Sequence, residues 1–217
     1  YLLPDRFSSD YYEAAKRRSP RDWEALYQCR PVSESGNMFR REAWGRYAKL
    51  PRMMDTIVQS WDLTFQRTTS GSYVVGQVWG RKNADYYLID QVRGRWGFVE
   101  TCEQIRQLSR RYPEARAKLI EKKANGAAVL DALGREVGGM LAVEPKGSKE
   151  ERGWAVQPYV EAGNVWIPER APWVPAFIEE AAAFPVGAHD DQVDAMTQAI
   201  RYLDAGGLTA LRALASW

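Results

Sequence analysis

The spacing of hydrophobic residues changes near residue 55. Residues 56–64, 72–80 and 86–92 are rich in β-branched and aromatic side chains, and turn residues separate them at 70–71 and 82–83. Runs of this length and composition are typical of strands. Three successive strands with short connections predict an antiparallel meander.

Beyond residue 95 the pattern alternates between helix-like and strand-like segments. Helices are expected at residues 97–112, 126–136, 148–161, 171–184 and 190–203, and short strands at 117–120, 140–143 and 164–167. A meander followed by this alternation predicts an α/β domain. Its mixed sheet would contain three antiparallel strands and then parallel strands, with helices on both faces.

The chain before the first predicted strand has a different character. Prolines interrupt it repeatedly, the last of them Pro51, and proline restricts the backbone and removes a hydrogen-bond donor. We therefore expect residues 1–52 to form a linker or approach segment. Residues 53–205 would form the folded domain, and residues 206–217 a C-terminal tail.

Composition limits the class of protein. A chain of 217 residues that is 45% hydrophobic can bury one sizeable core. No apolar run approaches the ~20 residues that a membrane helix needs, so no membrane partner is expected. Cys29 and Cys102 lie far apart and make neither a disulfide framework nor a metal-ligand pair, which suits a reducing cytoplasm.

The distribution of charge says more than its sum. The net charge of +2 does not by itself indicate a nucleic-acid-binding protein. Residues 1–52, however, hold 11 of the 30 Lys and Arg residues and only 7 of the 28 Asp and Glu residues. The basic excess therefore lies in the first part of the chain, and the later part has acidic residues in excess.

Two acids occupy informative positions in the predicted strands. Asp62 lies within the first strand, where a carboxylate is costly unless it is paired or bound to metal; an outward-facing Asp on an edge strand is the alternative. Glu121 follows the strand 117–120, and α/β folds place ligand-binding groups at strand ends. Next to Lys122 and Lys123, it is equally compatible with a solvated position.

A third group of acids opens the last predicted helix. Asp190, Asp191 and Asp194 are spaced so that two carboxylates share one helix face. Acids at a helix N-terminus also act as caps and interact favourably with the helix dipole. The cluster by itself therefore has a structural explanation as well as a functional one.

In combination the acids predict a metal site. Three or four carboxylates brought together raise one another's pKa values, and a divalent cation removes that penalty. Oxygen ligands favour Mg²⁺ or Mn²⁺ over zinc, and no Cys/His set competes. Two such ions about 4 Å apart can activate water and stabilise the leaving oxygen of a phosphodiester.

Four motifs in this order carry a resemblance. They are residues 23–31 (WEALYQCRP), 60–64 (SWDLT), 120–126 (IEKKANG) and 189–195 (HDDQVDA). The first resembles the segment that follows the ATPase domain of tailed-bacteriophage large terminases. The other three resemble the three acidic motifs of the nuclease domain of these proteins. These domains belong to the ribonuclease H-like, or resolvase-like, nuclease superfamily.

The resemblance implies a metal-dependent endonuclease that cuts concatemeric viral double-stranded DNA during genome packaging, in the host bacterial cytoplasm. It implies two Mg²⁺ or Mn²⁺ ions as cofactors. Asp62 would bridge the two ions, Glu121 would hold one and Asp191 the other. Asp190 or Asp194 would lie close by, and the sequence leaves open which member of this cluster binds directly.

The resemblance also implies partners. They are double-stranded DNA, the small terminase subunit, the portal protein and an ATPase domain in the same polypeptide. No Gly-x-x-x-x-Gly-Lys-Ser/Thr phosphate loop occurs in the chain, so the ATPase domain would precede Tyr1. The isolated nuclease domain would be monomeric.

Basic residues near the acids are candidate DNA contacts. Lys146, Lys149 and Arg152, around Gly147, are favoured for contacts with the phosphate backbone, which position DNA without reading its sequence. Lys122 and Lys123 are further candidates, with a solvated face as the alternative. His189 would position water or substrate from outside the ligand set, although a histidine before a helix is more often a cap or a packing residue.

Two other functions remain open at this point. A Holliday-junction resolvase-like recombination nuclease would share the acids but would act on branched DNA, usually as a stable dimer. A non-catalytic module could instead dock on the portal or motor through aromatic residues such as Trp166 and Trp173. Metal-dependent cleavage distinguishes the docking module from either nuclease.

Overall fold

The computed structural model describes residues 38–64 and 73–206 of the chain. The motif at residues 23–31 and nearly all of the predicted C-terminal tail lie outside the described residues. None of the helices in the described ranges is both long enough and apolar enough to cross a membrane.

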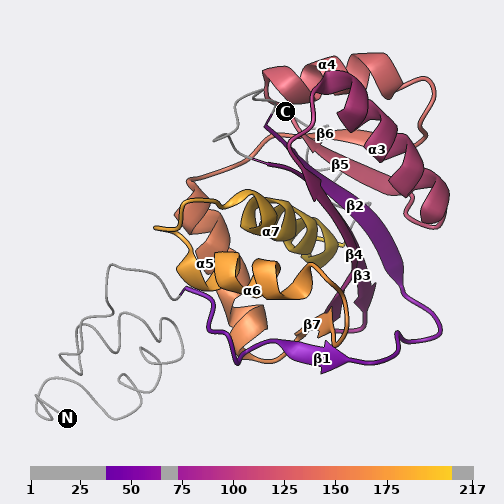
Figure 1. The fold of residues 1–217 in the computed structure, drawn as a ribbon. Helices are drawn as coiled ribbons and strands as arrows, with labels where there is room; N and C mark the ends of the chain where they lie inside the picture. Colours follow the sequence, from indigo (N-terminus) through magenta and orange to yellow (C-terminus); the bar gives the residue numbers. More distant parts are fainter. Residues whose placement is uncertain (1–37, 65–72, 207–217) are drawn as a thin grey trace, which may run out of the picture. The chain divides into compact units, whose positions relative to one another are not determined.

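A seven-stranded mixed sheet forms the centre of the described unit (Figure 1), with the strand order β1-β7-β4-β3-β2-β5-β6. Its strands are β1 (Gly45–Tyr47), β2 (Thr56–Leu63), β3 (Val74–Lys82), β4 (Asp85–Gly94), β5 (Ala117–Glu121), β6 (Met140–Val143) and β7 (Val165–Pro168). β2, β3 and β4 form the predicted antiparallel meander. β5 and β6 extend it in parallel from β2, and β7 and β1 extend it in parallel from β4.

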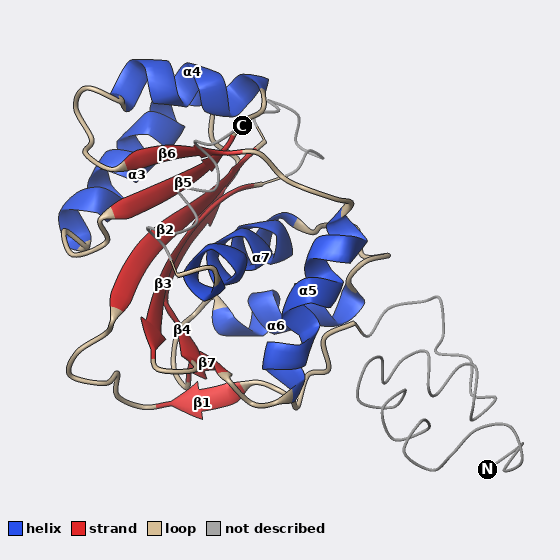
Figure 2. Ribbon diagram, turned by 180° about the vertical axis from the view of Figure 1, so that it is seen from behind, coloured by secondary structure: helices blue, strands red, loops and turns tan. Residues whose placement is uncertain are grey.

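Helices cover both faces of this sheet (Figure 2). α3 (Phe98–Arg111) and α4 (Ala124–Leu133) lie on one face, and α5 (Lys149–Glu161), α6 (Val174–Ala183) and α7 (Asp191–Asp204) lie on the other. Each face has its own buried hydrophobic cluster, one containing Trp61 and Ile105 and the other containing Phe177 and Met196. The predicted fold class, a mixed α/β sheet with helices on both faces, is confirmed.

The folded unit includes residues that the sequence assigned to the approach segment. Phe39 and Trp44 are buried in the core, and β1 pairs in parallel with β7. A strand of three residues is too short to show an alternating pattern, which is why it left no signal in the sequence. The unit therefore extends to the N-terminal side of residue 53, the boundary that the sequence suggested.

Alternation along β2 decides where the candidate site lies. Trp61 packs into the cluster under α3, whereas Ser60 contacts Gln198 of α7. Successive side chains of a strand point to opposite faces. Asp62 therefore lies on the α7 face, together with Ser60.

Candidate functional site

The acids on β2 and β5 lie next to each other. The two strands are parallel and pair Trp61 with Ile120, so Asp62 and Glu121 occupy the next position of each strand and share a face. Both side chains are buried, with 7% and 8% of their surface exposed. The Lys123 ammonium lies 2.8 Å from Glu121 Oε1.

A glycine allows the chain to turn sharply after Glu121. A β-carbon at Gly126 would overlap the main-chain oxygen of Glu121. Without one, the first turn of α4 can lie directly against the end of β5. This close approach is the structural reason for a small residue at this place in the motif at 120–126.

α7 brings the third group of acids over the end of the sheet. The Gln198 side-chain amide donates to Ser60 Oγ at 2.9 Å and to the Leu119 carbonyl at 3.2 Å, which fixes α7 against β2 and β5. Asp194 lies one turn before Gln198 and faces the two strand-end acids. Asp62, Glu121 and Asp194 line one small cavity of about 20 Å³, together with Trp61, Pro145, Arg152 and Gln198.

The crowded carboxylates perturb one another. Burial is the largest effect raising the pKa of Asp62, and the charges of Asp194, Asp191 and Glu121 raise it further. Burial also raises the pKa of Asp191, although the Tyr73 N–H donates to its Oδ2 at 3.0 Å and acts in the opposite direction. The neighbouring carboxylate charges therefore disfavour ionisation of Asp62.

Two cations from α5 compensate part of this charge. Lys149 Nζ lies 2.7 Å from both Asp190 Oδ2 and Asp194 Oδ2, and Arg152 Nη2 lies 2.9 Å from Asp194 Oδ1. Burial lowers the pKa of Lys149, but its hydrogen bonds to the two carboxylates outweigh this effect and raise the pKa. A capping box between Ser148 and the third helical residue fixes the first turn of α5, which carries Lys149.

Comparisons with known proteins identify the family of this domain. The family model for the terminase RNase H-like domain matches residues 59–203, which include all the acids described above. The chain belongs to the terminase RNase H-like domain family. No curated protein matches it.

Solved structures similar to this terminase RNase H-like domain share its fold at low sequence identity. The large terminase of a thermophilic bacteriophage is 13% identical, with a TM-score of 0.65, over 94% of this chain and 52% of that one. The chain thus spans about half the length of that large terminase. The large terminase nuclease of another thermophilic phage, G20c, is 16% identical, with a TM-score of 0.57, over 75% of this chain and 96% of that one.

The G20c nuclease has also been solved with magnesium bound. That structure has a TM-score of 0.53 and 15% identity, over 75% of this chain and 95% of the other. In the described part of the present chain, no three His, Cys, Asp or Glu side chains converge on a single metal position as they are placed. The chemistry of the donors nevertheless fits a hard divalent cation, because all are carboxylates and a cation would relieve their repulsion.

The basic residues expected to contact DNA have different surroundings. Lys149 and Arg152 both contact Asp194, which together with Asp62, Glu121 and Asp191 is called the acid cluster below, and Arg152 is buried. Lys122 pairs with Glu144 at 2.8 Å, Lys123 pairs with Glu121, and Lys146 is exposed. The role of these residues in DNA binding stays a prediction.

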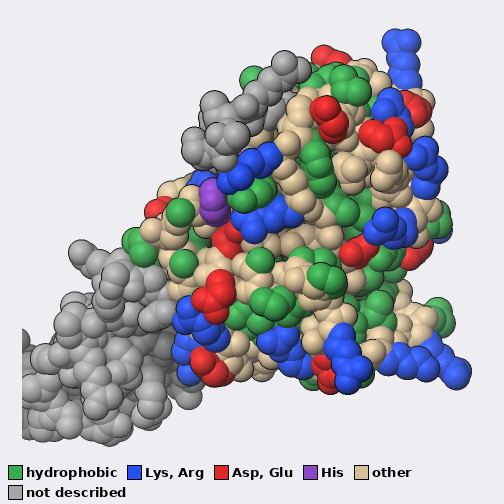
Figure 3. All heavy atoms as spheres, in the orientation of Figure 1, with side chains coloured by type: hydrophobic (Ala, Val, Ile, Leu, Met, Phe, Trp, Pro, Cys, Tyr) green, Lys and Arg blue, Asp and Glu red, His purple; other side chains and the backbone are tan. Residues whose placement is uncertain are grey.

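The region around His189 contains residues that the sequence did not single out. The His189 ring packs edge-on against Tyr73 with centroids 5.1 Å apart, and its Nδ1 lies 3.9 Å from Asp191 Oδ2. The guanidinium of Arg93 lies over the Tyr73 ring. In Figure 3 basic side chains lie beside the chain's single histidine, and acidic side chains lie close to them.

Sequence reasoning also missed Gln198. It follows Asp194 by one helical turn and is polar on a face that is otherwise buried against the sheet. That spacing was a usable signal, because residues four apart share a helix face. Tyr73 acts through its backbone N–H, for which side-chain patterns give no signal.

Proposed function

We propose that this domain is a metal-dependent DNA endonuclease that hydrolyses phosphodiester bonds with two Mg²⁺ or Mn²⁺ ions. The observation that carries the proposal is the meeting of Asp62, Glu121 and Asp194, with Asp191 close by, at adjacent strand ends in a terminase RNase H-like domain. Several buried carboxylates this close together are costly unless they are paired or bind a cation.

The acids have distinct roles in the proposal. Asp62 is the central ligand in this proposal, because it lies beside Glu121 on the neighbouring strand and lines one cavity with Glu121 and Asp194. Glu121 supplies a carboxylate from β5, and Asp191 and Asp194 supply carboxylates from α7. Bound at these residues, divalent ions would activate water and stabilise the leaving oxygen of the phosphodiester.

The choice of magnesium or manganese rests on the donor set. Among the residues of the site the donors are carboxylate oxygens, which suit hard cations. Structures of the G20c large terminase nuclease with bound magnesium, zinc and cobalt support the use of a divalent ion.

Lys149 and Arg152 hold the ligands of α7 in place. Each donates to Asp194, so that its carboxylate has a fixed orientation before any ion binds. Lys149 also connects Asp194 to Asp190. In this role the two cations position a ligand, and Lys146, which is exposed on the segment just before α5, is the better candidate for contact with the DNA backbone.

The substrate we infer is concatemeric viral double-stranded DNA, cut during genome packaging in the host bacterial cytoplasm. Family membership supports this inference, as does similarity to phage large terminases. The partners would be an ATPase domain on the same polypeptide, the small terminase subunit and the portal protein. Cutting would then occur where the packaging motor holds the DNA.

The experiment that tests the function is a plasmid cleavage assay. Wild-type protein should nick and linearise supercoiled plasmid with Mn²⁺ or Mg²⁺, and EDTA should abolish cleavage. Asp62→Asn should reduce the rate by orders of magnitude, because it removes the central ligand. Asp131→Asn, the same chemical change at an exposed position on α4, should cut at the wild-type rate.

Two results would contradict the proposal. Full activity in EDTA would exclude a metal-dependent reaction. Equal cleavage by Asp62→Asn and Asp131→Asn, with both proteins folded, would place the chemistry elsewhere. A four-way junction as a second substrate distinguishes a resolvase, since preferential cutting of the junction over linear duplex would favour that function.

A further inference from the structure

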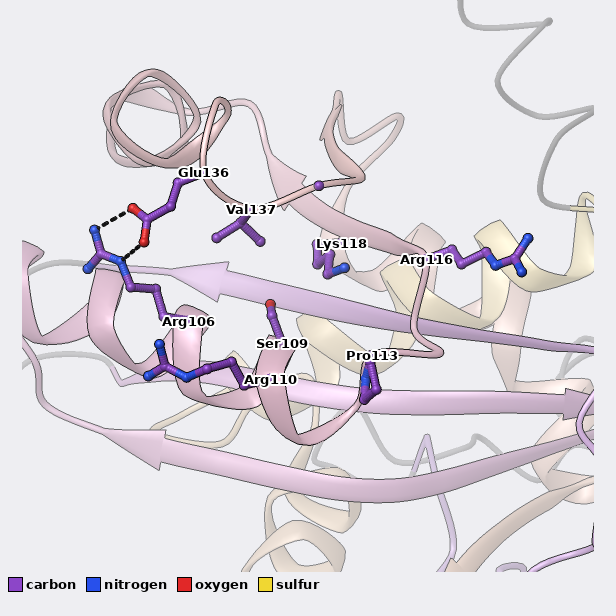
Figure 4. Close-up of a pocket in the computed structure, with 9 residues that line it drawn as sticks. Arg106, Ser109, Arg110, Pro113, Arg116, Lys118, Glu136 and Val137 are labelled. Atoms are coloured by element: carbon purple, nitrogen blue, oxygen red, sulfur yellow. Dashed lines mark hydrogen bonds and ion pairs between the residues drawn. The ribbon is translucent and has the colours of Figure 1, made fainter.

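A second cavity lies on the opposite face of the sheet from the acid cluster. It has a volume of about 480 Å³ and lies between the C-terminal half of α3, the start of β5 and the segment 136–138 (Figure 4). Lys118 of β5 lines it. Lys118 pairs with Gln59 and lies three residues before Glu121, so the two point to opposite faces of the strand. The cavity is therefore separate from the candidate active site.

The walls of this cavity are strongly basic. Arg106, Arg110, Arg116 and Lys118 line it against one carboxylate, Glu136. Glu136 is held by Arg106, with Nε–Oε1 and Nη2–Oε2 distances of 2.7 and 2.9 Å. In Figure 4 Lys118 lies between this ion pair on one side and Arg116 on the other. Glu103, outside the lining, pairs with Arg110 at 3.1 Å and with Arg106 at 3.6 Å, so Lys118 and Arg116 are the cations of the lining that have no ion-pair partner among the described residues.

Lys118 is the residue that requires an explanation. Only 7% of its surface is exposed, and within the described part of the chain no carboxylate is within ion-pair distance of its ammonium group. Burial lowers its pKa and is the one cause of that shift, which agrees with the lack of a charged partner. The stem of Lys118 is buried, and its ammonium group reaches the cavity without a carboxylate partner among the described residues, so its charge faces the cavity.

A second donor without an acceptor lies beside it. Gln59 is fully buried and pairs with Lys118 across β2 and β5. Its Oε1 accepts hydrogen bonds from Trp61 Nε1 at 3.2 Å and from Ser109 Oγ at 3.5 Å. Its Nε2 has no partner among the described residues. The unpartnered amide of Gln59 thus belongs to the strand neighbour of Lys118, behind the lining of the basic cavity.

We propose that this cavity binds a small phosphate-bearing anion, such as pyrophosphate or the phosphate end of a nucleotide, with the Lys118 ammonium as the main contact. A phosphate group offers several acceptor oxygens, and it forms strong charge-assisted hydrogen bonds with Lys and Arg. The volume is in the range of small-molecule sites. DNA held at the acid cluster lies on the other face of the sheet. A free small phosphate compound therefore suits this cavity better than a phosphate of the bound DNA.

Titration of the full chain with pyrophosphate in EDTA tests the proposal. Calorimetry at constant ionic strength should show saturable binding to the wild type. Lys118→Met keeps the side-chain volume and removes the donor, and it should weaken binding about tenfold or more, the loss expected for one charge-assisted hydrogen bond. Lys82→Met, which removes the same charge at an exposed ion pair with Asp55, should bind within about twofold of the wild type.

A measurement on the wild type keeps the test decisive if Lys118→Met does not fold. Pyrophosphate should shift the backbone amide NMR signals of Ser109, Lys118 and residues 137–139, and leave those of Asp62 and Asp194 unchanged. Arg116→Gln, at an exposed position of the rim, should weaken binding about twofold to threefold.

Four outcomes would overturn the proposal. The first is no saturable binding of pyrophosphate to the wild type. The second is equal binding to folded Lys118→Met. The third is a set of amide shifts confined to the acid cluster. The fourth is a Lys118-dependent affinity for a 12-base-pair duplex without any for pyrophosphate, which would identify the ligand as the DNA backbone.

Discussion

The ion pair between Arg152 and Asp194 should be worth far more than any surface pair of this domain. Their side chains are only 10% and 7% exposed, and Nη2 lies 2.9 Å from Oδ1. Arg152→Met removes the cation and keeps an apolar stem of similar length. The Asp194 carboxylate then stays buried with Lys149 as its remaining cation.

The size of the effect follows from burial. Removing one partner of a buried pair typically costs 3–5 kcal/mol, because the other charge is left uncompensated. Since Lys149 still pairs with Asp194, we expect a loss of about 2–3 kcal/mol for Arg152→Met. For a domain of this size that corresponds to a fall in Tm of roughly 4–12 °C. Arg152→Met/Asp194→Asn should recover most of the loss.

Urea and thermal unfolding in EDTA measure this directly. The matched control is Arg41→Met, which breaks a 2.7 Å pair with Glu179 whose side chains are 50% and 63% exposed; it should cost less than about 1 kcal/mol. Equal losses for Arg152→Met and Arg41→Met would refute the reasoning. So would a double variant less stable than Arg152→Met alone, because the carboxylate would then not be the source of the penalty.

Three further predictions concern Asp62, Gly126 and Lys146. Burial and neighbouring carboxylates raise the pKa of Asp62, so the folded metal-free protein retains a proton that the unfolded chain releases. The stability of the folded protein should therefore fall as pH rises from about 4 through that raised pKa. Asp62→Asn should flatten this fall and raise the Tm at pH 7 in EDTA. A variant whose stability depends on pH in the same way as that of the wild type would contradict the prediction. Gly126→Ala should lower the free energy of unfolding in urea by about 1–3 kcal/mol, and it should slow cleavage by displacing α4 from Glu121. Gly138→Ala should leave the free energy of unfolding nearly unchanged, because a β-carbon there meets open space. Lys146→Ala should reduce the salt dependence of DNA affinity by about one phosphate contact; an unchanged slope would exclude that contact.

The sequence predicted the sheet well because its signals were local. β2, β3 and β4 are each rich in β-branched and aromatic residues, and the carboxylate of Asp62 stands out in such a strand. β1 has three residues and pairs with a strand more than a hundred residues away. Its existence depends on tertiary contacts, which no local pattern encodes.

The surroundings of the acids were harder to predict for the same reason. Charge and spacing marked Lys149 and Arg152 as basic residues near a glycine, and from the sequence they were candidates for phosphate contacts. The structure places both on the carboxylate of Asp194, which lies on a different helix. Lys118 gave no signal at all, because its burial depends on α3 packing over β5.

The most direct test of the account is the location of manganese in the folded protein. Crystals of the wild type soaked in Mn²⁺ should give anomalous difference density among the carboxylates of Asp62, Glu121, Asp191 and Asp194, and crystals of Asp62→Asn should give little or none. The nearest oxygens to the density would also show which acids of α7 bind directly. Manganese bound elsewhere in the wild type, with these carboxylates free of it, would contradict the claim that the acid cluster is the metal site.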